Sequence, residues 1–163
     1  MSVRPVGPAD VPAVVGLVRE LAAYEHAAHE VRLTEEQLHT ALFGDSPALF
    51  GHVAVRDGAV VGTALWFLNF STWRGTHGVY LEDLYVQPRH RGTGLGRELL
   101  RTLAATCVER GYERLEWSVL DWNTPSIEFY RAVGAVPMDG WTVFRLTDDA
   151  LAAFAADGRG TAG

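Results

Sequence analysis

The segment Arg91-Gly92-Thr93-Gly94-Leu95-Gly96 has the residue types and spacing most typical of ligand chemistry in this chain. An apolar run ends shortly before it at Val86, and a helical pattern begins within it near Gly94. At such a strand-to-helix junction, backbone N–H groups and the positive end of the helix dipole favour phosphate oxygens. Glycine lets a ligand approach the backbone closely and permits a positive φ. The segment therefore predicts a phosphate-binding loop.

Three phosphate-loop patterns compete for this segment. A Walker loop needs a lysine, and the chain contains none. The dinucleotide fingerprint needs a third glycine where Arg97 stands. The pattern present is R-x-x-G-x-G, formed by Arg91, Gly94 and Gly96, and it resembles the acetyl-CoA pyrophosphate loop of the GNAT superfamily of acetyltransferases. An ordinary glycine-rich turn is the alternative.

Further segments are similar to the diamine (spermidine/spermine) acetyltransferases of that superfamily. They are Glu20–Glu25, Leu33–Glu35, Tyr80–Val86 with the glycine loop, and Trp122-Asn123-Thr124-Pro125-Ser126-Ile127-Glu128-Phe129-Tyr130. The resemblance covers nearly all of the chain up to about Leu146. It implies direct transfer of an acetyl group from acetyl-CoA to a primary amine of a small molecule, such as a polyamine, a diamine or an amino-acid-like amine.

The resemblance also implies which residues bind acetyl-CoA. Backbone groups of the central strand would pair with the pantetheine arm as an added strand would. Asn123 is equally well explained as a helix N-cap, and both roles are compatible. The implied contacts are Leu84, Tyr85 and Val86 for the arm, Arg91, Gly92, Thr93, Gly94, Leu95, Gly96 and Arg97 for the pyrophosphate, and Asn123 and Ser126 near the arm.

By the same resemblance, Tyr130 is the general acid that protonates the departing thiolate. A phenol with a pKa of about 10 is a plausible proton donor to a thiolate that is slightly less basic. The alternative is a core aromatic residue beside Phe129.

The amine needs a proton acceptor, because an alkylammonium has a pKa of about 10.4. Neighbouring side chains on a regular strand point to opposite faces, so only one of Glu82 and Asp83 is expected to face the amine. The resemblance assigns that role to Glu82; a solvated surface acid is the alternative. A serine replaces the acidic residue of the family's D-P-W at Ser71, which leaves the identity of the amine open. The implied substrate-side residues are Tyr24, Glu25, Glu82, Asp83, Glu116, Trp117, Ser118 and Asp139.

The expected elements form a mixed α/β domain, residues 1–150. The resemblance implies that this domain has the GNAT fold, a twisted, mostly antiparallel sheet splayed at the cofactor strand. Asp57-Gly58 predicts a hairpin turn, Thr34 with Gln37 predicts a capping box, and Asp10 and Thr147 are candidate helix caps. A short helix and a frayed tail are expected over 151–163. Strands are expected over 3–6, 50–56, 60–69, 79–86, 115–120 and 141–146, and helices after Asp10, over 34–43, from Gly94, and over 123–133.

The composition of the chain disfavours several classes of function. The chain has 163 residues and a net charge of −6, which disfavours a duplex nucleic-acid binder. No apolar run approaches the roughly 20 residues that cross a membrane. The single cysteine, Cys107, lies on an apolar helix stripe, and the histidines at 26, 29 and 39 do not complete a metal site. We expect a cytoplasmic enzyme without a metal, and by family analogy a homodimer. A protein acetyltransferase and a non-catalytic acyl-CoA sensor are the alternatives.

Overall fold

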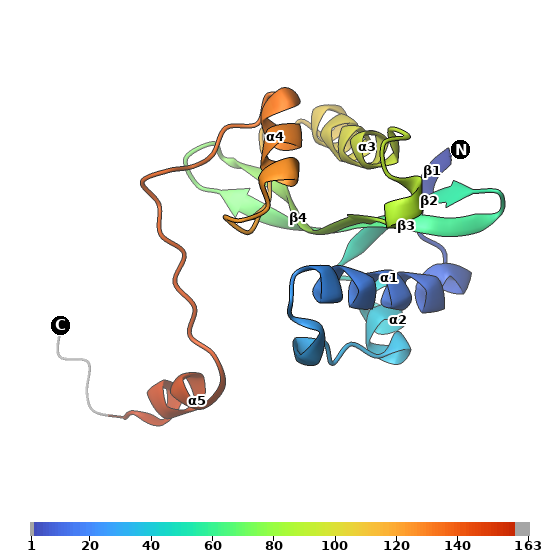
Figure 1. Cartoon of the computed structure of the whole chain (residues 1–163). Helices are drawn as coiled ribbons and strands as arrows, with labels where there is room; N and C mark the ends of the chain where they lie inside the picture. Colours follow the sequence, from blue (N-terminus) through green and yellow to red (C-terminus); the bar gives the residue numbers. More distant parts are fainter. Residues whose placement is uncertain (1, 159–163) are drawn as a thin grey trace. The chain divides into compact units, whose positions relative to one another are not determined.

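The computed structural model describes residues 2–158. These residues divide into two compact units, the first ending at Trp122 and the second beginning at Asn123. The first unit is built on a five-stranded sheet in the order β1-β2-β3-β4-β5 (Figure 1). Neighbouring strands from β1 to β4 are antiparallel, and β4 and β5 are parallel. The mixed α/β, mostly antiparallel architecture is confirmed. The strands are β1 (Ser2–Pro5), β2 (Phe50–Arg56), β3 (Ala59–Ser71), β4 (Thr76–Val86) and β5 (Leu115–Glu116).

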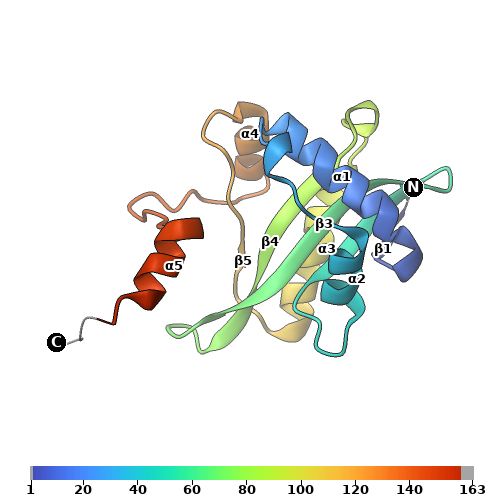
Figure 2. The ribbon, with the colours of Figure 1, turned by 90° about the horizontal axis from the view of Figure 1, so that it is seen from below.

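Helices cover both faces of this sheet. Helices α1 (Val11–Tyr24) and α2 (Glu35–Phe43) lie on one face and α3 (Leu95–Arg110) on the other (Figures 1 and 2). The valines of α1 pack with Leu38 and Leu42 of α2 against Val53 and Leu65 of the sheet. The predicted stripe of α3 is confirmed, since it is buried at Leu95, Leu99, Leu103 and Cys107.

A hairpin turn and a helix N-terminus have the geometry that local sequence signals predict. Asp57 and Gly58 both have positive φ values, 50° and 78°, as the tight hairpin between β2 and β3 requires. The Thr34 hydroxyl accepts from the Gln37 N–H, and the Gln37 side chain accepts from the Thr34 N–H, each at 3.1 Å. This capping box fixes the start of α2, which ends at Phe43 as predicted.

Asp10 precedes α1 but does not cap it as predicted. Its carboxylate accepts from the Gly7 N–H at 2.7 Å and from the Arg4 guanidinium at 2.6 and 3.0 Å. It therefore closes the short 3₁₀ turn at Pro8–Asp10 instead. Thr147 precedes the last helix, α5 (Asp148–Ala156), but its side chain makes no capping bond there.

Two predicted strands differ from the structure. The strand expected over 115–120 is reduced to β5, which pairs with β4 at two positions, Val79↔Leu115 and Tyr80↔Glu116. The strand expected over 141–146 is absent from the described residues. The backbone groups of a strand need hydrogen-bond partners on an adjacent strand. An apolar pattern raises the propensity to form a strand but does not determine which strand lies beside it.

The second unit contains α4 (Thr124–Ala132), close to the predicted range, and α5. A short helix and a frayed tail are predicted over 151–163; α5 begins earlier, at Asp148, and ends at Ala156, and 159–163 lie outside the described residues. Between residues 2 and 158, no helix has both the length and the apolar character needed to span a membrane.

The capping box provides a test of the fold. Thr34→Ala removes the acceptor for the Gln37 N–H, so we expect the free energy of unfolding to fall by about 1 kcal/mol. Urea denaturation measures this change. Thr72→Ala, at an exposed turn residue, is the matched control and should change stability by less than about 0.5 kcal/mol. Equal losses in the two variants would contradict the capping role.

Candidate active site

Strand β4 carries two carboxylates at a break in its pairing with β3. Leu65 of β3 lies opposite Asp83 and the next residue, Trp66, lies opposite Leu81, so Glu82 is the extra residue of a β-bulge. The regular strand assumed for these two acids is therefore wrong at this position. Asp83 shares a sheet face with Leu65, whose side chain belongs to the core under α1 and α2.

Asp83 is half-buried, and its surroundings are acidic. Burial is the main cause that raises the pKa of Asp83 to about 6, and the negative charges of Glu82 and Glu25 raise it further. Glu25 directly follows α1, and burial raises the pKa of its carboxyl as well. We call Glu25, Glu82 and Asp83 the acidic cluster. Such clustering costs free energy unless a cation is bound, and perturbed pKa values of this kind often mark functional sites.

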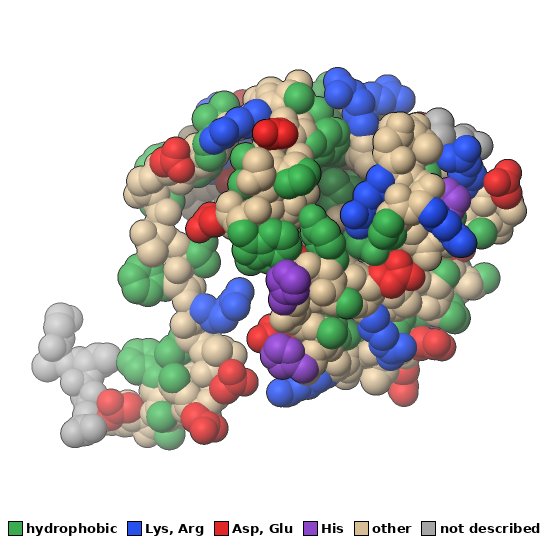
Figure 3. Space-filling view, viewed as in Figure 1, with side chains coloured by type: hydrophobic (Ala, Val, Ile, Leu, Met, Phe, Trp, Pro, Cys, Tyr) green, Lys and Arg blue, Asp and Glu red, His purple; other side chains and the backbone are tan. Residues whose placement is uncertain are grey.

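The glycine loop has the backbone geometry that a phosphate cradle needs. Gly92 and Gly94 have φ values of +75° and +88°, and Gly94 is the N-cap of α3. A Cβ added at either glycine would meet no heavy atom within 4 Å, so the space beside the backbone is open. The Thr93 hydroxyl donates to the His90 carbonyl at 2.6 Å and holds the turn. Arginine side chains lie around the point where β4 passes into α3 (Figure 3). The loop fits a pyrophosphate.

The end of β4 that leads into this loop has a free edge. Because β5 pairs only with Val79 and Tyr80, the described residues supply no β5 partner for 81–86. Backbone groups of Leu84, Tyr85 and Val86 can therefore pair with an extended ligand, as predicted for the pantetheine arm. The Val86 carbonyl already accepts a hydrogen bond from Arg91 Nε at 2.9 Å, so a ligand would share this acceptor with Arg91.

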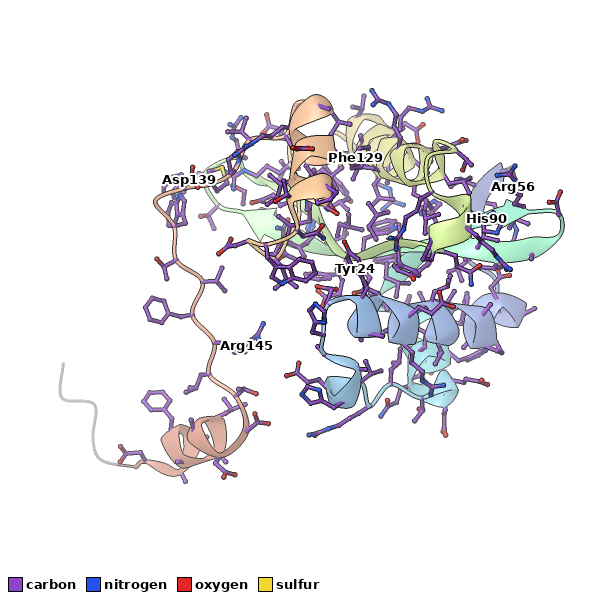
Figure 4. All side chains as sticks on the ribbon, in the orientation of Figure 1. Tyr24, Arg56, His90, Phe129, Asp139 and Arg145 are labelled. Atoms are coloured by element: carbon purple, nitrogen blue, oxygen red, sulfur yellow. The ribbon has the colours of Figure 1, made fainter. Side chains whose placement is uncertain are left out.

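The end of α1 meets the glycine loop through aromatic contacts. The Arg91 guanidinium lies 5.2 Å from the ring centroid of Tyr24 and 5.3 Å from that of Tyr85. Figure 4 shows Tyr24 at the end of α1 and His90 in the connection that follows β4. The structure thus places a predicted substrate-side residue, Tyr24, beside a predicted cofactor-loop residue, Arg91.

The predicted substrate-side segment Glu116–Ser118 also lies next to β4. Glu116 pairs with Tyr80, and the Tyr80 hydroxyl and the Ser118 hydroxyl are 2.8 Å apart. Trp117 stands between these two contacts in the chain. The first unit therefore combines a phosphate cradle, a free strand edge and an acidic cluster along one strand.

Comparison with known proteins identifies the family. Residues 16–135 match the acetyltransferase (GNAT) family. This chain belongs to that family. Thialysine N-epsilon-acetyltransferase of Bos taurus is 34% identical, over 91% of this chain and 94% of that protein. Spermidine/spermine N(1)-acetyltransferase-like protein 1 of Homo sapiens is 32% identical, over 87% of this chain and 22% of that protein. An integron cassette protein from the mobile metagenome of V. cholerae has the same fold, with a TM-score of 0.80, 24% identity, and coverage of 95% and 97% of the two chains.

The other predicted site residues of the acetyltransferase lie in the second unit. The Asn123 side chain accepts from the Ser126 N–H at 3.4 Å, so it caps α4, and its cofactor role stays a prediction. Tyr130 is half-buried in α4, and its ring centroid lies 5.5 Å from that of Phe129. Asp139 is exposed in a turn that also contains Gly140. The roles of Tyr130 and Asp139 stay predictions.

Two contacts beside the candidate site could not be predicted from the sequence. The ring of His26, a possible metal ligand by residue type alone, lies 5.4 Å from that of Trp122. Gln87 Nε2 donates to Glu20 at 3.1 Å and links the end of β4 to α1. No local signal predicts either contact, because the partners lie far apart in the chain. Within residues 2–158, no group of three or more His, Cys, Asp or Glu side chains could hold a metal ion.

Replacement of Gly94 tests the phosphate cradle. Gly94→Val places a branched side chain in the open space and strains a backbone with φ of +88°, so we expect CoA affinity to fall by at least roughly a hundredfold. Calorimetry with CoA measures this. Gly111→Val is the matched control, because Gly111 follows the other end of α3 with φ of +72° and equally open space. An unchanged affinity in a folded Gly94→Val protein would remove the loop from the site.

The raised pKa of Asp83 predicts a pH dependence of stability. The folded protein binds the Asp83 proton more tightly than the unfolded chain, whose Asp83 has the ordinary pKa of 3.8. Stability is therefore lost as pH rises from 3.8 to about 6, and above that the loss stays constant. We expect Asp83→Asn to be more stable than the wild type by roughly 2–3 kcal/mol at pH 7.5 and nearly equal to it at pH 4. Urea denaturation without ligand tests this. A variant that is less stable at pH 7.5 would contradict the assigned environment.

Proposed function

We propose that this acetyltransferase transfers the acetyl group of acetyl-CoA directly to a primary amine of a small diamine or diamino acid. The observation that carries the proposal is the acidic cluster, which lies on β4 and at the end of α1, next to the strand edge and loop that fit acetyl-CoA. The names of the relatives support a substrate with more than one amine, since thialysine and spermidine each carry at least two.

The acidic cluster can bind the amine as a cation. Glu25 and Asp83 both have raised pKa values because burial, and for Asp83 also neighbouring negative charge, disfavours their charged forms. An ammonium placed between these carboxylates relieves that repulsion, so binding should lower both pKa values. The third carboxylate of the cluster, Glu82, would then be available to bind a second amine of the substrate.

The cluster can also remove the proton that blocks attack on the thioester. An alkylammonium has a pKa of about 10.4, so transfer to an ordinary glutamate with a pKa of about 4.3 costs about 8 kcal/mol. Transfer from an ammonium in solution to Asp83 of the empty site, where its pKa is raised to about 6, costs about 2 kcal/mol less, and a bound ammonium reduces this gain. Asp83 therefore shares with Glu82 the role first predicted for Glu82 alone, directly or through a water molecule.

Acetyl-CoA, when bound, supplies an activated acetyl group as its thioester. The free edge of β4 orients the extended arm, and the glycine loop holds the pyrophosphate. The freed amine attacks the acetyl carbon without a covalent enzyme intermediate. Tyr130 gives its phenolic proton to the departing thiolate, a role that the family resemblance supports. A homodimer is a further expectation that rests on that resemblance, and a cytoplasmic location is one that rests on the composition of the sequence.

The substrate proposal is tested with an amine panel. Purified protein and acetyl-CoA are incubated separately with thialysine, L-lysine, spermidine, 1,4-diaminobutane, 1-aminobutane and a lysine-containing peptide, and products are identified by mass spectrometry. We expect acetylation of one or more diamines or diamino acids at least tenfold faster than of 1-aminobutane. Acetylation of the peptide alone would indicate a protein acetyltransferase. Binding of acetyl-CoA with no product from any amine would indicate a sensor.

Tyr130→Phe tests the general acid. The variant loses one hydroxyl and keeps the ring, so we expect kcat to fall by about 10²–10⁴-fold while CoA affinity and melting temperature change little. Phe129→Leu is the comparison, because it removes the neighbouring ring and should act on stability more than on kcat. A kcat close to that of the wild type in Tyr130→Phe, with chemistry rate-limiting, would leave water as the proton donor.

A further inference from the structure

Five side chains form a continuous stack at the end of α1. Tyr85 of β4 and Tyr24 of α1 flank the Arg91 guanidinium at 5.3 and 5.2 Å. The Tyr24 ring lies 5.8 Å from that of Trp122, which in turn lies 5.4 Å from that of His26. We call this the Arg91 stack. It connects the glycine loop, β4, the end of α1 and the segment that follows β5.

A hydrogen bond to β4 holds the Arg91 side chain in this stack. Its Nε donates to the Val86 carbonyl at 2.9 Å, so the guanidinium is fixed to the end of β4. Tyr85, at 6% exposure, is a buried support, whereas Tyr24 is 36% exposed and depends on its neighbours for its position. Cations over aromatic rings at such distances contribute even at exposed sites. The arginine of the phosphate-binding pattern therefore also contacts a residue of the amine side.

We propose that Arg91 is a positioning residue for the amine site: it holds Tyr24, and with Tyr24 the end of α1 that carries Glu25, against β4. This inference rests on the proposed function, because it concerns the same acidic cluster. Glu25 is the residue directly after Tyr24, and its charge acts on Asp83. If Tyr24 moves, Glu25 moves relative to Glu82 and Asp83, and the cluster loses the geometry that binds an ammonium.

A pyrophosphate ligand and a positioning residue predict different kinetics. An arginine that only binds pyrophosphate would affect acetyl-CoA and leave the Michaelis constant for the amine unchanged. An arginine that positions Tyr24 affects the amine, and its effect depends on the presence of the Tyr24 ring. The two residues should then be energetically coupled, which a double-mutant cycle detects.

The test compares Arg91→Gln, Tyr24→Leu and the double variant, with thialysine and acetyl-CoA as substrates. We expect each single change to raise KM for thialysine by about 3- to 10-fold, with the double variant no worse than the worse single one. Arg101→Gln, which removes an exposed arginine of α3, is the control and should leave KM unchanged. Tyr24→Phe should raise KM less than Tyr24→Leu, because it keeps the ring over Arg91. An unchanged KM for thialysine in Arg91→Gln, or effects that multiply in the double variant, would overturn the proposal.

A second readout does not require turnover. The Trp122 indole N–H resonance, assigned with Trp122→Phe, should shift in Arg91→Gln and not in Arg101→Gln, because the Tyr24 ring lies 5.8 Å from the Trp122 ring. If the wild type acetylates no amine but this shift occurs, the proposed function fails while the positioning by Arg91 stands. If amines are acetylated and the resonance does not move, the positioning role fails and the proposed function stands.

Discussion

The interrupted pairing of β4 is the constraint on which the site depends. On one side, β5 pairs with β4 only at Val79 and Tyr80 within residues 2–158, so β5 leaves the following backbone groups without a partner from that strand. On the other side, the bulge at Glu82 shifts the register against β3 and brings Asp83 onto the face that carries α1. The same strand then runs into the glycine loop. One strand thus provides an edge for an extended ligand, two carboxylates and the approach to a phosphate cradle.

Amine acetylation makes opposite electrostatic demands, and in the proposed mechanism the acidic cluster addresses both. A cationic substrate requires negative charge to bind, whereas attack requires the loss of a proton to a group of adequate basicity. Three carboxyls, one directly after α1 and two on β4, would supply the charge. Burial, and then the negative charges of its two neighbours, raise the pKa of Asp83, which makes it a better proton acceptor than an isolated aspartate. The repulsion that weakens the empty site is the one that an ammonium relieves.

Local patterns in the sequence predicted the parts of the fold that local chemistry decides. The capping box at Thr34, the turn at Asp57-Gly58 and the stripe of α3 have their partners within a few residues. The glycine loop was predictable for the same reason. The pKa of Asp83 was not, because Glu25 reaches it from a distant helix, and neither was the contact between Arg91 and Tyr24. The strand expected over 141–146 failed because a strand also requires a neighbour, which its own residues cannot specify.

The proposed role of the acidic cluster is to bind the amine and also to deprotonate it. The most direct test is kcat/KM for the amine from pH 7 to 10 in wild type, Glu82→Gln and Asp83→Asn. We expect a loss of about 10²–10⁴-fold at pH 7 in at least one variant, which shrinks toward pH 10 as free amine becomes available without a base. A loss of equal size at every pH would rule out deprotonation by the cluster and leave it with charge binding alone.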